Sequence, residues 1–526
     1  MSTARCALLL SLIAARAAPQ EPRFPDRPAQ DALSYALDLT VDPAAARLEG
    51  TVAYRFRALE EPLTAIRLDA RRSDAWSVRF TRDGAPWDGD WGEDHVVLTL
   101  PAPVLPGGEV TFQAALSGTP VDGFYFQDNA HGERMAFTDH YSIRARGWLP
   151  CEDHPADRAR FSLRLRYPEG NEACAYGVEV PADAADAAAD AAPEGWRLLH
   201  TASDVEIPPY MWAMVIGPLT RVPEAGDARL CDHLVYRQDV DRAKAMLVHH
   251  AAWIAAMERT FGPYPFGKYM TVQCPTRWGG FEAPGTVQLS EQLYAAGAAG
   301  VGTLAHELVH MWFGDGTGYA EWREVWLSEG FASYFGPWLM AESGGPTLAE
   351  SMQRLRDAWL RSRDGRTKTV RDDSFVHPDQ ALNANTYPKG AWVLHMLRGE
   401  LGDDAFFAAL RAYATECRGR SVTTADFVAI VERSTGKDLG WFFAQWLDRV
   451  GCPELEVRAT GGDITVRQVQ PNAPYRFWLR LRWKDATGAP QQRRILVEDA
   501  QHTLQVDGDV RELQVDPDVE LLFRER

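Results

Sequence analysis

The segment His306-Glu-Leu-Val-His310 has the residue types and spacing of a hydrolytic metal site. Two histidines four residues apart on a helix project from one face, so both imidazoles can bind the same ion. Glu307 points away from that pair, and its carboxylate can therefore reach a water molecule on the ion. The alternative is a buried helix whose two histidines make ordinary hydrogen bonds. The pattern favours zinc.

A third protein ligand is expected because hydrolytic zinc sites use three and leave one position open. Glu329 follows His310 after eighteen intervening residues, within a segment of helical period from Glu321 to Glu342. That spacing allows a turn and an antiparallel helix. We predict one Zn²⁺ per chain, bound by His306, His310 and Glu329. Glu324 is expected either to orient a ligand histidine or to be an exposed helix charge.

The chemistry of such a site is hydrolysis of an amide bond. Zinc lowers the pKa of water towards 7 and polarises the carbonyl that is attacked. Glu307 is the predicted general base, which takes the water proton and passes it to the leaving amine. The sequence thus indicates a zinc-dependent metallopeptidase.

The hydrophobic period changes twice along the chain. From about residue 34 to 217 apolar residues alternate with polar ones, as in Tyr35, Leu37 and Leu39, which predicts an antiparallel β-domain. Helical periods follow, over 240–261, 303–313, 321–342, 390–401 and 424–435, the last with Thr424 as N-cap and Gly436 as terminator. Strand-like alternation returns after residue 452.

These changes predict a multidomain α+β protein. The expected parts are an N-terminal antiparallel β-domain (18–218), an α-rich catalytic domain (219–451) and a small C-terminal β-sandwich-like domain (452–526). The acidic low-complexity stretch at 182–192 is expected to be a surface loop or a short exposed helix.

The first residues predict export. Arg5 precedes an apolar run from Cys6 to Ala15, and a small-x-small cleavage site ends at Ala17. Residues 1–17 are therefore expected to be a signal peptide, with a buried helix as the alternative. The run is shorter than the roughly 20 residues that span a bilayer. We expect no membrane span and a periplasmic or extracellular location.

Composition narrows the possible partners. The 526 residues carry a formal charge of −18, without the basic stripe that nucleic acid requires. No nucleic-acid partner is expected, and the oligomeric state is left open. Six cysteines follow the predicted signal peptide, either as disulfides or as buried thiols.

Several segments together resemble one family of enzymes. HELVHMWFG at 306–314 and WLSEGFASYF at 326–335 are similar to the signature of the zinc aminopeptidases that include aminopeptidase N and the leukotriene-hydrolase aminopeptidases. RWGGFEAPG at 277–285 resembles the GxMEN loop of that family, and TYPKGAWVLHML at 386–397 its Tyr-x-Lys-Gly helix. PCEDHPADRARF at 150–161 and PPYMWAMVIG at 208–217 resemble its N-terminal domain. The resemblance implies a thermolysin-like catalytic domain and peptide substrates with a free N-terminus.

The resemblance also implies roles for individual residues. Glu282 takes the position of the glutamate that binds the substrate α-amine, and a buried ammonium needs such a charged partner. Tyr387 takes the position of the tyrosine that donates to the tetrahedral oxyanion. Trp278 should line the pocket for the first side chain, while Gly279 and Gly280 let the peptide backbone approach closely.

The chain departs from the family pattern at substrate-binding positions. Phe281 and Ala283 replace the Met and Asn of GxMEN, so one polar contact to the substrate is missing. Asp139 replaces a glutamine, and Tyr141 stands where a second amine-binding carboxylate or amide is expected. These departures imply weaker or rearranged amine recognition, for which Asp139 could compensate.

The function that these features favour is a secreted zinc aminopeptidase. Ala283 and Tyr141 favour an alternative on the same scaffold, an endopeptidase or a dipeptide-releasing peptidase. A noncatalytic binding relative is a third alternative, and the presence of Glu307 and Tyr387 opposes it.

Overall fold

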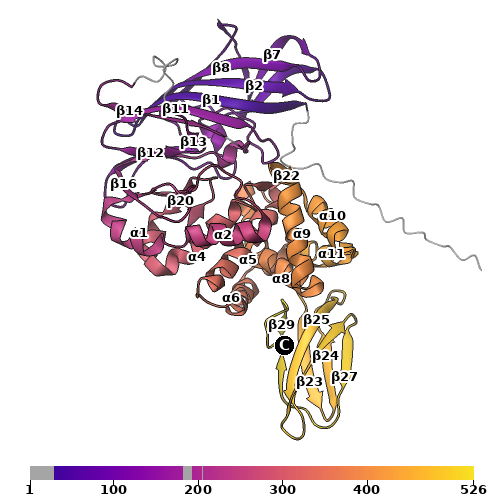
Figure 1. Cartoon of the computed structure of the whole chain (residues 1–526). Helices are drawn as coiled ribbons and strands as arrows, with labels where there is room; N and C mark the ends of the chain where they lie inside the picture. Colours follow the sequence, from indigo (N-terminus) through magenta and orange to yellow (C-terminus); the bar gives the residue numbers. More distant parts are fainter. Residues whose placement is uncertain (1–28, 182–191, 204) are drawn as a thin grey trace, which may run out of the picture.

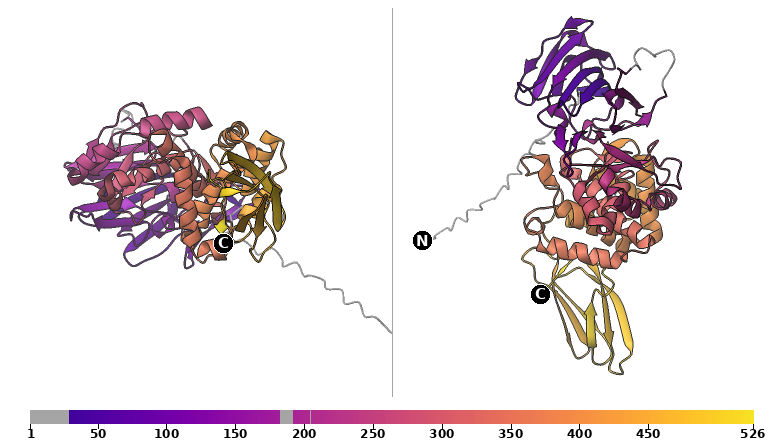
Figure 2. Two further views of the ribbon diagram at one scale, coloured as in Figure 1. Left: turned by 90° about the horizontal axis from the view of Figure 1, so that it is seen from below. Right: turned by 90° about the vertical axis from the view of Figure 1, so that its left-hand side faces the viewer.

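Three bodies stacked in a row make up the molecule (Figure 1). The structure is a computed structural model and describes residues 29–181, 192–203 and 205–526. A β-rich body and a smaller β-body lie at the two ends, with a helical body between them, as the side view in Figure 2 also shows. The predicted fold class is confirmed. The predicted signal peptide and nearly all of the 182–192 stretch lie outside the described residues.

An eight-stranded sheet dominates the N-terminal body. Its strand order is β13 (Val178–Glu179), β14 (Trp196–Ala202), β11 (Arg160–Pro168), β1 (Gln30–Asp42), β2 (Arg47–Ala58), β8 (Glu109–Gly118), β4 (Trp76–Arg82) and β5 (Ala85–Pro86). Its neighbouring strands are antiparallel except β1 and β11, which pair in parallel from Ser34↔Arg160 to Thr40↔Arg166. This one parallel pair departs from the predicted antiparallel arrangement. An alternating pattern predicts which face of a strand is buried. It does not predict whether a neighbouring strand from a distant part of the sequence runs parallel or antiparallel.

Two smaller sheets complete this body. One contains β3 (Leu63–Asp69), β7 (His95–Val104) and β6 (Asp90–Trp91), and the other β12 (Glu172–Ala175), β15 (Met214–Gly217), β10 (Arg134–Thr138) and β9 (Phe124–Asp128). The loop that follows β10 turns towards the helical body.

The helical body has one mixed sheet at its edge. The sheet order is β16 (Leu219–Val222), β17 (His233–Tyr236), β18 (Thr271–Cys274), β20 (Val287–Ser290) and β19 (Gly280–Phe281). Two strands, β21 (Thr317–Tyr319) and β22 (Arg420–Val422), pair in parallel elsewhere. The helices are α1 (Val240–Met246), α2 (His250–Phe261), α3 (Glu291–Ala296), α4 (Val301–His310), α5 (Trp326–Glu342), α6 (Leu348–Arg361), α7 (Asp364–Thr367), α8 (Gly390–Leu401), α9 (Asp403–Glu416), α10 (Thr424–Thr435) and α11 (Gly440–Leu447).

The predicted helices are present with local corrections. The segment 240–261 is divided into α1 and α2, and α5 starts at Trp326 after a 3₁₀ turn. The N-cap of α10 is Thr423, not Thr424, because the Thr423 hydroxyl accepts from Asp426 N–H and the Asp426 carboxylate accepts in return. Gly436 ends that helix at a φ of 66°, as predicted.

Close approaches between helices α4, α5 and α8 bring the motifs of the sequence together in space. A Cβ placed on Gly390, the first residue of α8, would lie 2.9 Å from Gly330 Cα in α5. A Cβ placed on Gly336 in α5 would lie 3.2 Å from the backbone of His306 in α4. Helix α5 therefore lies against both neighbours with little space for side chains at these crossings.

The C-terminal body is a two-sheet β-module. One sheet contains β27 (Gln501–Gln505), β24 (Asp463–Gln468), β23 (Glu454–Thr460) and β29 (Arg524–Glu525), and the other β26 (Pro490–Val497), β25 (Phe477–Lys484) and β28 (Arg511–Val515). Arg356 on α6 forms an ion pair with buried Asp516 at 2.8 Å, and Trp478 Nε1 donates to Glu400 at 2.9 Å. These contacts attach the module to α6 and α8.

Two further expectations concern the whole chain. None of the helices in the described residues is long and apolar enough to cross a membrane. The six cysteines within the described ranges are free thiols, five of them buried, which agrees with the second of the two alternatives for them.

We predict that Gly390→Ala destabilises the protein by about 1–3 kcal/mol, because the new methyl group overlaps the backbone of α5. Urea unfolding followed by tryptophan fluorescence measures this. Gly399→Ala in the same helix is the matched control, since the nearest atom to its added Cβ is the flexible Arg494 Nη2 at 3.4 Å. Equal effects of the two changes would contradict the close-approach argument.

Candidate active site

Helices α4 and α5 bring two histidines and a glutamate to one point. His306 Nε2 lies 3.2 Å from Glu329 Oε2, His310 Nε2 lies 3.5 Å from the same oxygen, and the two Nε2 atoms are 3.2 Å apart. Zn–N bonds of about 2.0–2.1 Å in a tetrahedron put neighbouring donors about 3.3 Å apart. The spacing of the three donors therefore fits one zinc ion.

The orientation of His310 supports the same assignment. Its Nδ1 lies 3.2 Å from the carbonyl oxygen of Phe313 and 2.9 Å from the hydroxyl of Ser328. A carbonyl oxygen only accepts, so Nδ1 carries the proton and Nε2 directs its lone pair at the other donors. His310 is thus held in the tautomer that a metal ligand needs.

The site contains three buried carboxylates. Glu282, Glu307 and Glu329 are 6%, 4% and 3% exposed. Burial raises the pKa of Glu307 and of Glu282, whereas His310 and His306 overcome burial and lower the pKa of Glu329 to about 2. Burial lowers the pKa of His310, but Glu329 and the other two carboxylates raise it, to a net value of about 10. Positive charge is thus favoured at His310 Nε2, either as a proton or as a metal ion that takes the place of that proton. The charges of the site therefore call for a cation.

Glu307 lies against a glycine of the neighbouring strand. A Cβ placed on Gly280 would lie 2.3 Å from Glu307 Oε1 and 2.5 Å from its Cδ, so only glycine leaves room for this carboxylate. Nothing lies within 4 Å of a Cβ placed on Gly279. Of the two glycines, only Gly280 is required for steric reasons. A larger residue there would overlap the carboxylate of Glu307, the predicted general base.

Tyr387 comes from a π-helical turn, Asn385–Lys389, at the start of α8. Its ring stacks on that of His306, with centroids 6.0 Å apart and an interplanar angle of 9°. Asn385 accepts from Trp359 Nε1 at 2.8 Å, and buried Lys389 donates to the carbonyl of Gly451 at 3.1 Å. These bonds position the turn, and with it Tyr387, beside the metal donors.

Two cavities meet at these residues. The first, the inner pocket, has about 310 Å³ of empty volume and is lined by Tyr141, Trp278, Gly280, Phe281, Glu282, His306, Glu307, His310, Glu329, Leu382 and Tyr387. The second, the outer cleft, has about 840 Å³ and is lined by Trp278, Gly279, Gly280, Gly302, Thr303, His306, Glu307, Ser333, Pro337, Leu355 and Tyr387. The inner pocket is the more enclosed of the two. All three metal donors line it, and His306 and Glu307 also line the outer cleft.

The structure brings most of the predicted site residues together. His306, Glu307, His310, Glu329, Glu282, Tyr387, Trp278, Gly279, Gly280 and Phe281 all line one or both cavities. Ala283 does not, because it is fully buried and its carbonyl oxygen accepts from Thr286 N–H in a turn behind the loop. The roles of these residues in a reaction remain predictions.

Two supporting residues lie elsewhere than expected. Both alternatives for Glu324 are wrong: it is buried rather than exposed, and it binds Arg371 at 3.0 Å and Thr424, at the start of α10, rather than a histidine. Asp139 does not enter the inner pocket: it accepts from Trp278 Nε1 at 3.0 Å and supports the pocket wall from behind. Glu324 is the last residue of the 3₁₀ turn Trp322–Glu324, which precedes α5. The helical period did not predict this turn.

Several residues of the site were not singled out from the sequence. Ser328 and the Phe313 carbonyl, which hold His310, and Leu382 in the pocket wall are examples. A hydroxyl or a leucine in an apolar segment has many structural roles, so only the fold identifies it. Ser328 is next to Glu329, and that adjacency was the only available hint.

A second cluster has the composition of a metal site but not its hydrogen bonding. Glu224 Oε2 lies 3.0 Å from His233 Nε2 and 2.6 Å from His250 Nδ1. Thr271 N–H donates to His233 Nδ1 at 3.0 Å, so the proton of the neutral ring is on Nε2, which donates to Glu224. Glu224 also accepts from the backbone N–H of His250 at the start of α2. This cluster joins β17 to α2 by hydrogen bonds.

A helical body that holds two histidines and a glutamate beside two further buried carboxylates defines the class of zinc metallopeptidases. Residues 31–190 match the peptidase M1 N-terminal domain, and residues 246–446 match the peptidase family M1 domain. The chain belongs to peptidase family M1. Membership in this family implies a catalytic zinc, which the donor set fits.

Curated relatives and solved structures agree with this assignment. The chain is 28% identical to aminopeptidase M1-B of Oryza sativa subsp. japonica over 83% of this chain and 52% of the relative, and 27% identical to aminopeptidase N of Streptomyces lividans over 54% and 38%. It spans about half the length of the curated relatives it matches. An M1 zinc metallopeptidase from Deinococcus radiodurans superposes with a TM-score of 0.67 at 26% identity, covering 80% of this chain and 94% of that chain.

We predict that Gly280→Ala lowers kcat by at least about 100-fold, because its methyl group displaces the Glu307 carboxylate and general-base catalysis is worth about that much. Zinc content, measured by plasma emission spectrometry, should stay at one ion per chain. Gly279→Ala is the matched comparison and should cause a much smaller loss. A Gly280→Ala variant as active as Gly279→Ala would refute the contact.

Proposed function

We propose that this chain is a zinc aminopeptidase that hydrolyses the first peptide bond of peptides with a free N-terminus. The single observation that carries the proposal is the position of Glu282. Its buried carboxylate lines the enclosed inner pocket and not the outer cleft, whereas His306 and Glu307 line both. A substrate can therefore place one residue with its ammonium in the pocket while the rest of the peptide extends along the cleft.

Recognition of the amine follows from burial and charge. An ammonium in the inner pocket loses water and needs a charged acceptor within hydrogen-bond distance. Glu282 supplies it, and an acetylated N-terminus would leave that carboxylate buried without its partner. Leaving a buried charge unpaired costs much more than losing an ordinary contact. The kcat/KM for peptides with a free N-terminus should thus exceed that for N-blocked peptides by a large factor.

His306, His310 and Glu329 are the residues that would hold the zinc. When bound, zinc acidifies a water molecule and polarises the scissile carbonyl. Glu307 takes the proton of the attacking water, and its raised pKa, caused by burial, suits a proton acceptor. It then gives the proton to the leaving amine, which departs along the outer cleft.

Tyr387 is proposed to donate from its hydroxyl to the oxygen that becomes negative during the attack. Burial and Glu329 raise the pKa of Tyr387, so this phenol keeps its proton and can act as a donor. The stacking of its ring on His306 fixes the distance of the hydroxyl from the metal donors.

The second candidate function is an endopeptidase or a dipeptide-releasing peptidase. Tyr141 in the inner pocket favours it, because this position lacks a second charged acceptor for the amine. The enclosure of the pocket behind Glu282 opposes it, since a chain that extends past the metal donors meets the aromatic wall. Comparison of free and N-blocked peptides separates these activities.

We expect the zinc-loaded protein to cleave Leu-7-amido-4-methylcoumarin and free peptides, and to lose this activity with 1,10-phenanthroline. N-acetylation of the substrates should lower kcat/KM by at least about 1,000-fold. Glu307→Gln should lower kcat by about 100-fold to 10,000-fold at unchanged zinc content. Equal cleavage of free and acetylated peptides would exclude an aminopeptidase, and a fully active Glu307→Gln variant would exclude this base.

We also propose export of the protein, on the support of the N-terminal sequence alone. Arg5, the apolar run to Ala15 and the small residues before position 18 are the features that a signal peptidase recognises. The mass of the protein recovered from an exporting host would show whether cleavage near Ala17 takes place. A full-length mass in the cytoplasmic fraction would contradict export.

A further inference from the structure

One loop of the N-terminal body contributes to the inner pocket. This loop, residues 139–144, follows β10 and places Tyr141 in the pocket lining opposite residues of the helical body. Tyr141 is 3% exposed, although it lies in a cavity wall. It is the one pocket residue that the N-terminal body supplies among the described residues.

Three aromatic rings hold the Tyr141 ring from different sides. Its centroid lies 5.8 Å from that of Trp278, 5.8 Å from that of Tyr210 and 5.7 Å from that of Trp322. The interplanar angles are 87°, 79° and 87°, so each contact is edge to face, the favourable geometry for aromatic pairs. The ring therefore has a defined position before any substrate enters.

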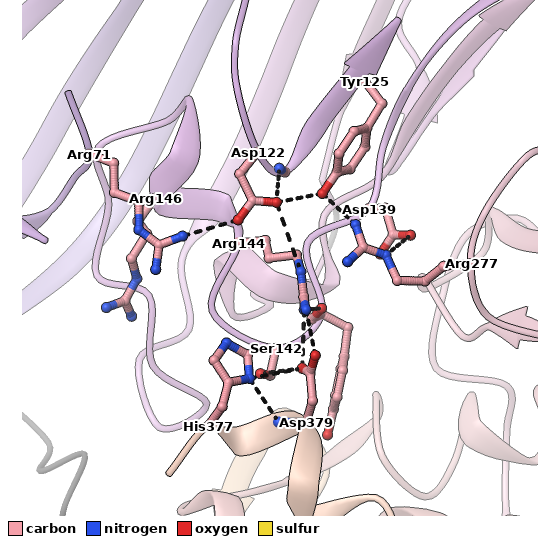
Figure 3. A network of polar contacts seen from close by, with 12 residues as sticks. Arg71, Asp122, Tyr125, Asp139, Ser142, Arg144, Arg146, Arg277, His377 and Asp379 are labelled. Carbon is pink, nitrogen blue, oxygen red and sulfur yellow. Dashed lines mark hydrogen bonds and ion pairs between the residues drawn. The ribbon is translucent and has the colours of Figure 1, made fainter. Parts of the chain in front are cut away.

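Asp139 anchors the first end of the loop to one wall of the pocket. Its carboxylate accepts from Trp278 Nε1 at 3.0 Å, from the Thr276 hydroxyl at 3.1 Å and from Arg277 Nε at 3.3 Å. Arg277 also donates to Tyr125, whose hydroxyl donates to Asp122 (Figure 3). The indole that faces Tyr141 is thereby fixed to the same loop.

Asp379 anchors the other end of the loop to the opposite wall. Ser142 donates to Asp379 Oδ1 at 2.8 Å, and Arg144 binds both carboxylate oxygens of Asp379 as well as the carbonyl oxygen of Tyr141. Figure 3 shows Ser142 and Arg144 converging on Asp379 from the N-terminal body. Asp379 lies in the 3₁₀ turn Pro378–Ala381, directly before Leu382 of the pocket.

We propose that this doubly anchored loop is the specificity element of the inner pocket, with Tyr141 as the residue that contacts the first side chain of the substrate. The pair Arg144 and Asp379 positions Tyr141 and does not touch the substrate. The substrate class is peptides whose first side chain is uncharged and apolar, with the fixed Tyr141 ring limiting its size. This inference rests on the proposed aminopeptidase function and names its substrate class.

The chemistry of the pocket walls supports that class. Away from the carboxylates and histidines at the metal donors, the lining is Tyr141, Trp278, Phe281, Leu382 and Tyr387, which are all uncharged. The charged groups behind the walls already have partners: Asp139 and Arg277 bind each other, as do Arg144 and Asp379. Once zinc and the substrate ammonium pair with the site carboxylates, an Asp or Lys side chain would be buried there without a counter-charge, at a large cost.

Size follows from the fixed position of the Tyr141 ring. A ring held by three neighbours does not move aside, so a bulky first side chain competes with it for space. Differences of one or two carbon atoms in such a pocket change kcat/KM by about 10-fold to 200-fold. Replacement of the ring by a methyl group should therefore change the order of preference among apolar residues.

The test is a panel of aminoacyl-coumarin substrates with Leu, Trp, Asp and Lys, measured on zinc-loaded full-length protein. Wild type should prefer Leu over Asp and Lys by about 100-fold or more in kcat/KM. Tyr141→Ala should reduce the ratio of Leu to Trp by about 10-fold, whereas Tyr141→Phe, the matched control that keeps the ring, should retain it. Binding of free L-leucine and L-tryptophan, measured by calorimetry, should show the same changes without turnover.

A double-mutant cycle tests the positioning pair. Asp379→Asn should lower the Leu-to-Trp ratio at unchanged zinc content, and Tyr141→Ala/Asp379→Asn should show no further decrease beyond Tyr141→Ala. Arg71→Gln is the control for the network: Arg71 binds Asp122 on the side away from the pocket, and its loss should leave the ratio unchanged. Additive losses in the double variant would assign Asp379 a general structural role and overturn its role in positioning.

The outcomes separate this inference from the proposed function. If the wild type turns over substrate and Tyr141→Ala has the same Leu-to-Trp ratio, the aminopeptidase function stands. The proposal that this loop is a specificity element is then overturned. No turnover, with selective amino-acid binding that Tyr141→Ala abolishes, supports the specificity element and overturns the enzyme. Absence of both turnover and binding overturns both.

Discussion

The interaction on which the structure depends is the burial of three carboxylates around two imidazoles at the meeting point of α4 and α5. Glu282, Glu307 and Glu329 lose almost all contact with solvent, and such charges are tolerated only beside a cation and fixed donors. The donor spacing of His306, His310 and Glu329 meets that need with zinc. The packing of the surrounding helices of the helical body holds these five side chains close together.

Glycine makes this arrangement possible at three places. Gly336 lets α5 approach α4, Gly330 and Gly390 let α8 approach α5, and Gly280 leaves space for the Glu307 carboxylate. An added methyl group would force atoms to shift at each of these contacts, least at Gly336, where its nearest neighbour would lie 3.2 Å away. The active site is therefore held by backbone contact between elements rather than by flexible side chains, which suits a site that must hold charges close together.

The general character of the site could be predicted because its motifs are local. Helical geometry alone places His306 and His310 on one face, and a segment with its own helical period carries Glu329. Predictions that depended on neighbouring segments were less successful. Glu324 binds Arg371 and α10, and Asp139 supports Trp278 from outside the pocket, because the partners of these side chains come from distant parts of the chain.

The sequence by itself determined the succession of a β-body, a helical body and a second β-body, the three metal donors and the general-base candidate, since periodicity and spacing within one segment define them. Only the tertiary structure decided which side chains close the inner pocket, where the carboxylates lie relative to the cleft, and that Arg144 of one body binds Asp379 of another. Those contacts join residues that are 235 positions apart. A linear pattern carries no information on such pairs, because packing between bodies selects them.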